Sequence, residues 1–318
     1  MNLKHLLAAL LAAGAFAPTL ATACSACGCT LNADWATQGF QGSTGLSLDL
    51  RHDYFDQDQL RNGHGRVDMG AISYPNDDEI QRFTRNHITT LTLDWGLSPD
   101  WGASVALPYI ERSHGTTAAG DTAPSFSRSS GIGGARVTLR YLGFAAQRDW
   151  GLQLGLKLPT GTTGVRFQAG PQAGEVLDAG LQPGTGSTDL VVGAFRFGSI
   201  GARLDYFVQA LAQLPLATHD DFKPARSLNL SVGLRYVGAG PVVPSLQLNV
   251  RHEGLESGAN ADPDNSGSTL AYLSPGATWT LAESVQAYGF VQLPVYQQVR
   301  GLQLEPRWSL SVGLRYGF

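Results

Sequence analysis

Apolar and polar residues alternate through most of the chain that follows residue 43. In 152–158, "LQLGLKL", the leucines fall on one face of an extended segment and Gln153, Gly155 and Lys157 fall on the other. A period of two is typical of β-strands, because successive side chains of a strand point to opposite faces. Twelve such runs occur, near 44–54, 86–97, 101–111, 133–142, 150–159, 188–198, 202–214, 226–237, 245–252, 268–281, 283–296 and 306–318.

The gaps between these runs alternate in length. Gaps after odd-numbered runs are longer and polar, whereas gaps after even-numbered runs are short, such as "SPD" and "SIG". Long loops on one side and short turns on the other are typical of an outer-membrane barrel. The sequence therefore predicts an all-β fold, a transmembrane antiparallel β-barrel of about 12 strands. A soluble β-sandwich is the alternative, but a sandwich does not need outward aliphatic residues in every strand.

The ends of the runs indicate their direction. Four odd-numbered runs end on Leu-Pro, at 107–108, 158–159, 214–215 and 293–294. Proline has no N–H to donate, so it suits the point where a strand leaves a sheet. Three even-numbered runs end on Leu-Arg-Tyr, at 139–141, 234–236 and 314–316, and Trp101 and Trp150 open runs at the same edge. These rings predict an aromatic girdle at the periplasmic membrane interface.

The first residues are typical of a cleaved signal peptide, predicted to span 1–23. A basic start at Lys4 precedes an apolar core at 6–17 and the small residues "ATA" at 21–23. Residues 24–42 then form a periplasmic, Cys-containing N-terminal segment, and 43–318 form the barrel. The net charge of −4 does not indicate a basic surface for binding nucleic acid. The predicted location is the outer membrane of a Gram-negative bacterium, with lipid and lipopolysaccharide as partners.

The chain ends in an alternating run that closes on an aromatic residue. In "WSLSVGLRYGF", Trp308, Leu310, Val312, Leu314, Tyr316 and Phe318 share one face. This ending resembles the C-terminal signature by which the barrel-assembly machinery recognises outer-membrane barrels. The resemblance implies that Phe318 contacts that machinery.

If the aliphatic residues face lipid, the opposite face lines the lumen. Nine basic and four acidic residues then point inward, and five of the arginines lie near the periplasmic edge. A ring of guanidinium groups there would favour anions; alternatively, these arginines only pair with acids and water and stiffen the wall. The five predicted selectivity residues are Arg140, Arg196, Arg203, Arg235 and Arg315.

A twelve-stranded barrel lies between a filled interior and a wide channel. Either a narrow pore or a lumen closed by residues 24–42 is compatible with the sequence. Phe207, Leu211, Tyr288 and Phe290 also point inward by parity. They form either a passage for apolar solutes or contacts for a plug.

Three cysteines lie within six residues at the predicted mature N-terminus, in "CSACGC". Cys24, Cys27 and Cys29 have the spacing of a soft thiolate site for Cu or Zn. Two alternatives compete with a metal site: lipidation of Cys24, and a disulfide between Cys24 and Cys27 in the oxidising periplasm. No cofactor is required by any other feature of the sequence.

Six histidines, His52, His64, His87, His114, His219 and His252, map to the long-loop end of the predicted barrel. A metal site or a hydrolase centre at the rim is one interpretation, and chance accumulation in polar loops is the other. No G-x-S-x-G stands in a strand–turn–helix context. We therefore predict that the protein is not an enzyme.

Three motifs carry a resemblance to a known family. "GIGGARVTLRY" (131–141), "LKLPTG" (156–161) and "QPGTGSTDLVVG" (182–193) resemble the outer-membrane barrel transporters known as meta-pathway phenol-degradation proteins. The family has Gly-Asp where this chain has Gly133-Gly134, and its pattern lacks the N-terminal cysteines. The resemblance implies a barrel that moves small, aromatic compounds.

The predicted function is movement of small solutes, anionic or aromatic, across the outer membrane. The alternative is a barrel that serves as an anchor or sheath. In that alternative, the N-terminal Cys cluster binds a metal or docks a periplasmic redox partner.

Overall fold

The computed structural model describes residues 30–40, 44–238 and 240–318. The predicted signal peptide (1–23) and all three cysteines lie outside these ranges. The strands are β1 (Gly45–Gly63), β2 (Gly65–Arg66), β3 (Ile80–Gly96), β4 (Trp101–Thr117), β5 (Ser125–Ile132), β6 (Arg136–Tyr141), β7 (Trp150–Lys157), β8 (Asp189–Ile200), β9 (Leu204–Pro215), β10 (Ser227–Tyr236), β11 (Val242–Glu253), β12 (Ser268–Ala282) and β13 (Val285–Gly317). Two single 3₁₀ turns, η1 (Met69–Ala71) and η2 (Ala179–Leu181), complete the elements. Across the described ranges, no helix is both long enough and apolar enough to cross a membrane.

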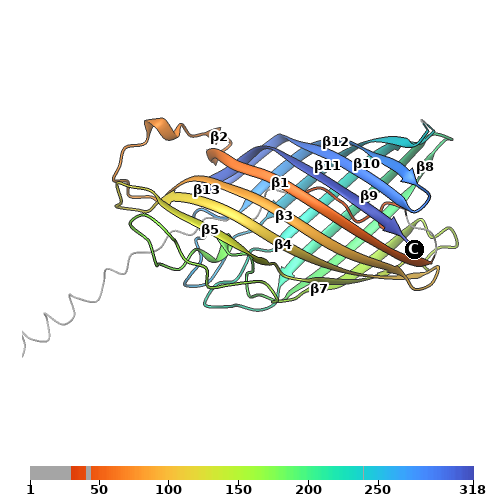
Figure 1. Ribbon diagram of the computed structural model, residues 1–318, viewed down its shortest axis with the longest axis horizontal. Coiled ribbons are helices and arrows are strands. Elements are labelled where there is room, and N and C mark those ends of the chain that lie inside the picture. The colour runs from red at the N-terminus through yellow and green to blue at the C-terminus, as the bar shows by residue number, and fades with distance from the viewer. Residues whose placement is uncertain (1–29, 41–43, 239) are drawn as a thin grey trace, which may run out of the picture.

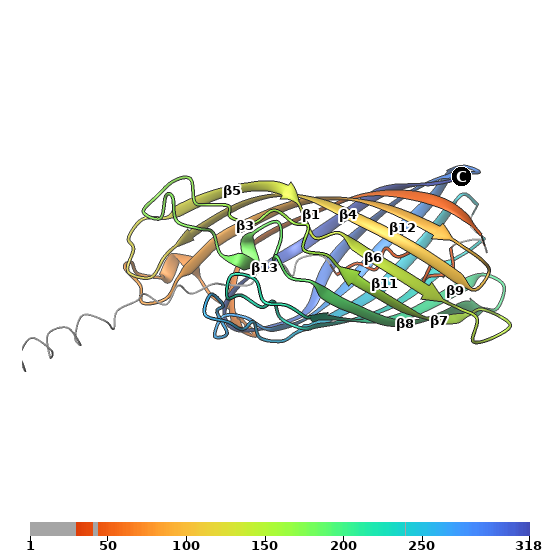
Figure 2. The same cartoon turned by 90° about the horizontal axis from the view of Figure 1, so that it is seen from below.

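The strands form one closed antiparallel barrel (Figures 1 and 2). Eleven elements pair in a continuous circuit, with β2 and β5 off that path, and β13 closes the circuit on β1. Residues 285–299 of β13 pair with β12, whereas 302–317 pair with β1. Because all these pairs are antiparallel, the chain must reverse within β13, and Gly301 has the positive φ of 66° that a tight reversal requires. β13 thus contributes two antiparallel strands to the barrel wall. The prediction of a barrel of about twelve strands is confirmed.

The outward face of the barrel is apolar and its inward face is polar. On β7, Leu152, Leu154 and Leu156 are exposed, while the intervening Gln153 and Gly155 are buried. A soluble protein would bury these leucines. The inverted arrangement places the aliphatic band against lipid, as transmembrane barrels require.

Aromatic rings border this band at both ends. At the end with the short turns, the exposed rings include Trp95, Trp101, Trp150, Trp279 and Tyr316. Neighbouring rings contact two of them: the ring centroids of Trp101 and Tyr141 are 4.7 Å apart in tilted geometry, and those of Phe144 and Trp150 are 4.6 Å apart and stacked. Tyr54 and Trp308 lie 5.7 Å apart toward the long-loop end. These rings have the placement that amphipathic aromatics take at membrane interfaces.

Several strands are longer than the alternation predicts. β1 continues through residues 55–63, β3 begins at Ile80, and β4 continues to Thr117. These extensions rise past the apolar band (Figure 1), where both faces of a strand are polar or covered by loops, so alternation no longer marks them. The long gap between the predicted runs 101–111 and 133–142 is not all loop, because β5 occupies 125–132 within it and pairs with β4.

The predicted strand at 133–142 is interrupted at 133–135. The three family-like motifs meet at this interruption. The Gly133 N–H donates to the Pro108 carbonyl at 2.8 Å, the Thr162 N–H donates to the Ile132 carbonyl at 2.8 Å, and the Gly184 N–H donates to the Thr162 carbonyl at 2.8 Å. A Cβ on Gly161 or Gly184 would collide with the other glycine. The backbones of the three motifs thus hydrogen-bond to one another and continue the barrel wall at 133–135, where regular strand pairing is interrupted.

An ion pair fixes the same region from the inside. Lys157 Nζ lies 3.0 Å from Asp189 Oδ2, and these residues are also strand partners on β7 and β8. The Ser187 hydroxyl donates to Asp189 Oδ1 at 2.6 Å. The "LKLPTG" and "STDL" segments are therefore joined by side chains as well as by backbone.

The inverted polarity makes a direct prediction for stability. Leu154, 56% exposed in the middle of β7, should face the bilayer interior. Leu154→Arg should lower the unfolding free energy in lipid vesicles by about 2–4 kcal/mol, because a guanidinium at the bilayer midplane is poorly solvated. Urea titration followed by tryptophan fluorescence measures this difference.

Leu216→Arg is the matched control. Leu216 is 57% exposed but lies just beyond the end of β9. Its substitution should change stability little. Equal losses in the two variants would contradict the assignment of the lipid-facing band.

Candidate functional site

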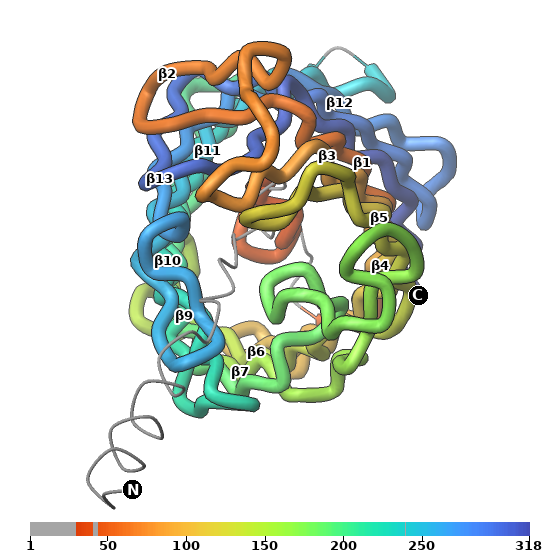
Figure 3. The backbone as a smooth tube through the Cα atoms, turned by 90° about the vertical axis from the view of Figure 1, so that its left-hand side faces the viewer, coloured from red at the N-terminus to blue at the C-terminus, as the bar shows by residue number. Residues whose placement is uncertain are grey.

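Residues 30–40 lie inside the barrel, and we call them the plug segment. Figure 3 looks into the barrel and shows this segment within the ring of strands. The Thr30 hydroxyl donates to Gln292 Oε1 at 3.0 Å, and Leu31 and Trp35 pack against Tyr288 and Phe290 of β13. The sequence left open whether the lumen is a pore or is filled, and the described part of the N-terminal segment occupies it.

Trp35 is the main apolar anchor of the plug segment. Its ring lies 4.7 Å from the Tyr288 ring and 5.0 Å from the Phe40 ring, in edge-on geometry. The Trp35 Nε1–H donates to Asp49 Oδ2 at 3.2 Å, and the Tyr288 hydroxyl donates to Asp49 Oδ1 at 2.9 Å. Asp49 thus satisfies two buried donors, and one carboxylate ties the plug segment to two strands.

Arg140 joins the wall to the plug segment by charge. Its guanidinium contacts both carboxylate oxygens of Asp94, at 2.6 and 2.9 Å, and lies 4.0 Å from Asp34 Oδ1. The Arg140 side chain is only 2% exposed. Gln153 Nε2 donates to the other oxygen of Asp34 at 3.1 Å. Burial strengthens such bidentate pairs and fixes their geometry.

Arg235 holds the other end of the plug segment. Its Nη2 donates to the Gln38 carbonyl at 2.7 Å, and its guanidinium lies 3.8 Å from the centroid of the Phe40 ring. Asp205 lies 3.6 Å away. This arginine therefore combines a hydrogen bond, a cation–π contact and an ion pair.

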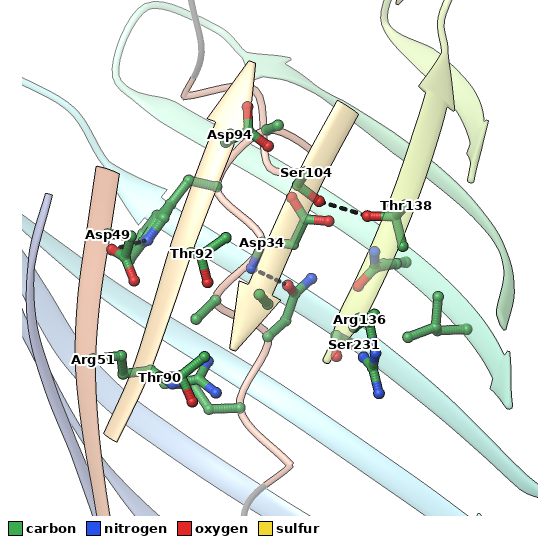
Figure 4. A pocket seen from close by; sticks show the side chains of 18 of the residues that line it. Asp34, Asp49, Arg51, Thr90, Thr92, Asp94, Ser104, Arg136, Thr138 and Ser231 are labelled. Atoms are coloured by element: carbon green, nitrogen blue, oxygen red, sulfur yellow. Dashed lines mark hydrogen bonds between the residues drawn. The ribbon is translucent and has the colours of Figure 1, made fainter. Parts of the chain in front are cut away.

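A cavity of about 330 Å³ remains between the plug segment and the wall. Figure 4 shows that its lining combines carboxylates, guanidinium groups and hydroxyls. The wall residues come from β1, β3, β4, β6, β7, β9, β10, β11 and β13. The cavity is thus a property of the whole barrel and has the size range of a small-molecule site.

The five predicted selectivity arginines do not form one ring. Arg140 and Arg235 hold the plug segment, and Arg315 lines the cavity, with Nη2 3.4 Å from Ser47 Oγ. Arg196 is 63% exposed and pairs with Asp149 at 3.1 Å, and the exposed Arg203 lies 3.4 Å from the Tyr236 hydroxyl. Arg196 lies on the outward face of β8, opposite Trp150 in register, so the prediction that its side chain faces the lumen is wrong; Arg203 lies in the turn between β8 and β9. The role of all five in ion selectivity stays a prediction.

The four inward apolar residues have different positions. Tyr288 and Phe290 contact the plug segment, Leu211 lines the cavity, and Phe207 is buried against Gly233. The alternation identified Tyr288 and Phe290 as inward residues, but it could not identify Asp34, Trp35 and Gln38. Those three lie in a segment without periodicity; the one available signal was an aromatic and an acid, "ADW", directly before the barrel.

The predicted metal site at Cys24, Cys27 and Cys29 lies outside the described residues and stays a prediction. Within 30–40, 44–238 and 240–318, no three His, Cys, Asp or Glu side chains are arranged to hold a metal ion. Metal analysis of the mature protein, compared with a Cys27→Ser variant, tests the cysteine site directly.

The six histidines are separated on the barrel. His114 is buried and lies 2.8 Å from the Thr84 hydroxyl, whereas His52 and His87 are outward neighbours whose ring nitrogens are 3.4 Å apart. His219 pairs with Asp220 at 3.4 Å in a loop. A hydrolase centre built from several of these side chains therefore has no support in their arrangement.

The long loops bring four carboxyl groups together at their end of the barrel. Glu79, Asp178, Glu256 and Asp262 come from three different loops and influence one another electrostatically. Burial and the neighbouring Asp262 raise the pKa of Glu79 to about 7, although the Thr116 hydroxyl donates to it at 2.6 Å. Burial among the other acids also raises the pKa of Asp178 well above its ordinary value.

Comparisons with known proteins bear on the fold. The sequence matches no protein-family model, and no curated protein matches it. The crystal structure of an outer membrane channel from Pseudomonas putida F1 superposes with a TM-score of 0.66 at 13% identity, covering 87% of this chain and 97% of that one. A monoaromatic hydrocarbon channel, CymD, reaches a TM-score of 0.48 at 9% identity, covering 93% and 99%. At these identities the likeness concerns the fold alone, which is that of outer-membrane barrels.

The loop carboxyl groups predict a pH dependence. Folded Glu79 holds its proton more tightly than an unfolded glutamic acid, whose pKa is near 4.5. Loop packing is therefore most favoured below about pH 4.5 and loses that advantage as pH rises to about 7. Hydrogen exchange of residues 176–182, corrected for intrinsic rates, should show faster opening at pH 8 than at pH 5.

Two variants make this prediction specific. Glu79→Gln resembles the protonated side chain and should keep the loops protected at pH 8. Glu175→Gln changes an exposed acid of the loop that contains Asp178 and should leave the pH dependence intact. Identical pH dependence in all three proteins would contradict the role of Glu79.

Proposed function

We propose that this protein moves small solutes across the outer membrane of a Gram-negative bacterium. The short-turn end would face the periplasm and the long-loop end the exterior, as in outer-membrane barrels. Solutes would pass through the lumen beside the plug segment. The protein acts in this proposal as a transport protein and not as an enzyme.

One observation carries the proposal: among the residues that the structure describes, the plug segment is attached to the wall without β-pairing. Its backbone–backbone hydrogen bonds are internal, such as the Phe40 N–H to the Trp35 carbonyl at 3.0 Å. Among the described residues, its links to the wall use side chains, including Arg140, Arg235 and Asp49. The plug segment can therefore shift while every strand of the barrel stays paired, and displacement of this segment would widen the passage.

The motif resemblance supports an aromatic solute as the finer assignment. The motif residues build the wall beside the cavity, with Lys157 adjacent in register to Arg136. The cavity also has apolar lining residues, Leu31, Trp35 and Leu211, which suit an apolar ring. Membership of the phenol-degradation transporters is thus part of the proposal.

Two further contacts of the barrel belong to this proposal. Lipopolysaccharide would surround the long-loop end of the apolar band. The barrel-assembly machinery would recognise Phe318, whose side chain is 73% exposed while its N–H donates to the Leu46 carbonyl at 2.9 Å. The terminal ring is thereby held at the closing strand pair and remains accessible.

Weakening the plug segment tests the proposed passage. Trp35→Ala removes two ring contacts and the hydrogen bond to Asp49, so the plug segment should leave the lumen more often. Single-channel conductance of the refolded protein in a planar bilayer should rise severalfold, or become noisier with larger open events. Trp279→Ala, which removes an exposed ring from the lipid-facing side, should leave conductance unchanged. Unaltered conductance in correctly folded Trp35→Ala would reject a gating role for the plug segment.

A further inference from the structure

Four arginines of the wall line one cavity: Arg315 lies near its short-turn end, and the other three come from distant strands. Arg51 belongs to β1, Arg136 to β6 and Arg251 to β11, and all three line the space beside the plug segment. Figure 4 shows Arg51 and Arg136 on different strands around this space. They lie close enough for the charges of Arg51 and Arg251 to act on Arg136. Like charges that lie close together repel, most strongly where they are partly shielded from solvent, so this arrangement calls for compensation.

Arg51 and Arg251 each have a carboxylate partner, whereas Arg136 has a neutral one. Arg51 Nε lies 2.8 Å from Asp53 Oδ2, and Arg251 Nη2 lies 3.1 Å from Glu253 Oε2. Arg136 donates from Nη2 to the amide oxygen of Gln213 at 2.9 Å. Within the described parts of the chain, Arg136 makes no ion pair closer than 4.0 Å.

The acids near Arg136 already have partners. Asp189 accepts from Lys157 at 3.0 Å, from Gln213 at 2.6 Å and from Ser187 at 2.6 Å. Three acids line the cavity itself, and each has partners of its own: Asp94 pairs with Arg140, Asp34 with Gln153 and Arg140, and Asp49 with Trp35 and Tyr288. The part of the cavity around Arg136 therefore has a surplus of positive charge.

Arg136 differs in this respect from Arg140 and Arg235, the two arginines that contact the plug segment. Arg140 and Arg235 each have a carboxylate within 4.0 Å. Arg315, which lines the cavity near the short-turn end, also has no ion pair within 4.0 Å among the described residues and lies 3.4 Å from Ser47 Oγ. A guanidinium kept in a protein interior without such a partner is costly unless an anion neutralises it. Guanidinium groups also match a carboxylate geometrically, because they offer parallel N–H donors.

We propose that the cavity binds a small organic anion, a carboxylate on a compact apolar body. Its carboxylate would lie at Arg136, within the field of Arg51 and Arg251, and would accept from the guanidinium of Arg136. Its apolar body would contact Leu31 and Leu211, which line the same cavity. A volume of about 330 Å³ accommodates a molecule of the size of benzoate. This assignment rests on the proposed transport function and names its substrate class.

Block of channel current tests the site. Benzoate, added to the refolded protein in a planar bilayer, should reduce the current in a saturable manner, whereas benzyl alcohol, its neutral analogue, should not. Arg136→Gln should raise the half-blocking benzoate concentration about tenfold or more, since a charge-assisted hydrogen bond to the carboxylate is lost. Arg136→Lys keeps the charge and should retain most of the block. Arg128→Gln, which neutralises an exposed arginine on β5, is the matched control and should behave as the unmodified protein.

The outcomes separate the anion site from the transport function. A conducting barrel on which benzoate and benzyl alcohol act alike, or on which Arg136→Gln has no effect, overturns the anion site and leaves the channel. A folded barrel that neither conducts nor admits solutes into vesicles overturns the transport function. The site is then decided by calorimetric titration of benzoate into the unmodified protein and Arg136→Gln in detergent. Binding that Arg136→Gln abolishes supports the site, and equal or absent binding rejects it.

Discussion

Lipid offers no hydrogen-bond partner to a peptide group, and the architecture of this protein follows from that constraint. Every backbone N–H and C=O within the bilayer must be satisfied by the chain itself, which for strands requires a closed circuit. The pairing of β13 with β1 supplies this closure. Even where regular pairing fails, at 133–135, the backbone of residues 158–162 and 184 continues the hydrogen bonds. The irregular, glycine-rich motifs are thus part of the same solution.

Closure in lipid also decides where the charges lie. Because the outer face is apolar, the ionisable side chains of the strands are confined to the lumen or to the two rims. A confined charge needs a partner, and the plug segment supplies several of them: Asp34 to Arg140, the Gln38 carbonyl to Arg235, and the Trp35 indole to Asp49. The plug segment is therefore stabilised by the electrostatics of the wall as well as by its aromatic contacts. Among the described residues, Arg136 and Arg315 are the two cavity arginines without an ion pair within 4.0 Å, and Arg136 is the one that lies in the field of Arg51 and Arg251.

The sequence predicts the membrane-embedded part of this fold well, because lipid imposes a strict rule on it. Leu152, Leu154 and Leu156 had to alternate with small or polar residues, and Trp150 had to lie at an interface. Beyond the apolar band, lipid no longer requires apolar and polar residues to alternate. Residues 55–63 and 112–117 therefore show no two-residue period in the sequence, although they belong to strands. Alternation gives neither the depth of an arginine in the barrel nor its contacts, and near a strand end it can fail to give the face. It grouped Arg196 and Arg203 with Arg140 and Arg235, although Arg196 faces outward and only Arg140 and Arg235 contact the plug segment. Asp34 and Trp35 lie in a segment with no period, and only tertiary contacts reveal their role.

The closing strand pair has a consequence for how the molecule is made. Ser47 of β1 pairs with Gly317 of β13, so the barrel closes only when its first and last strands pair. Contacts between such distant parts of a chain form slowly, since the intervening chain must first be ordered. The plug segment directly precedes β1 and occupies the space that this final pairing encloses. Closure of the barrel and enclosure of the plug segment are therefore coupled, because β13 closes the barrel by pairing with β1, the strand that directly follows the plug segment.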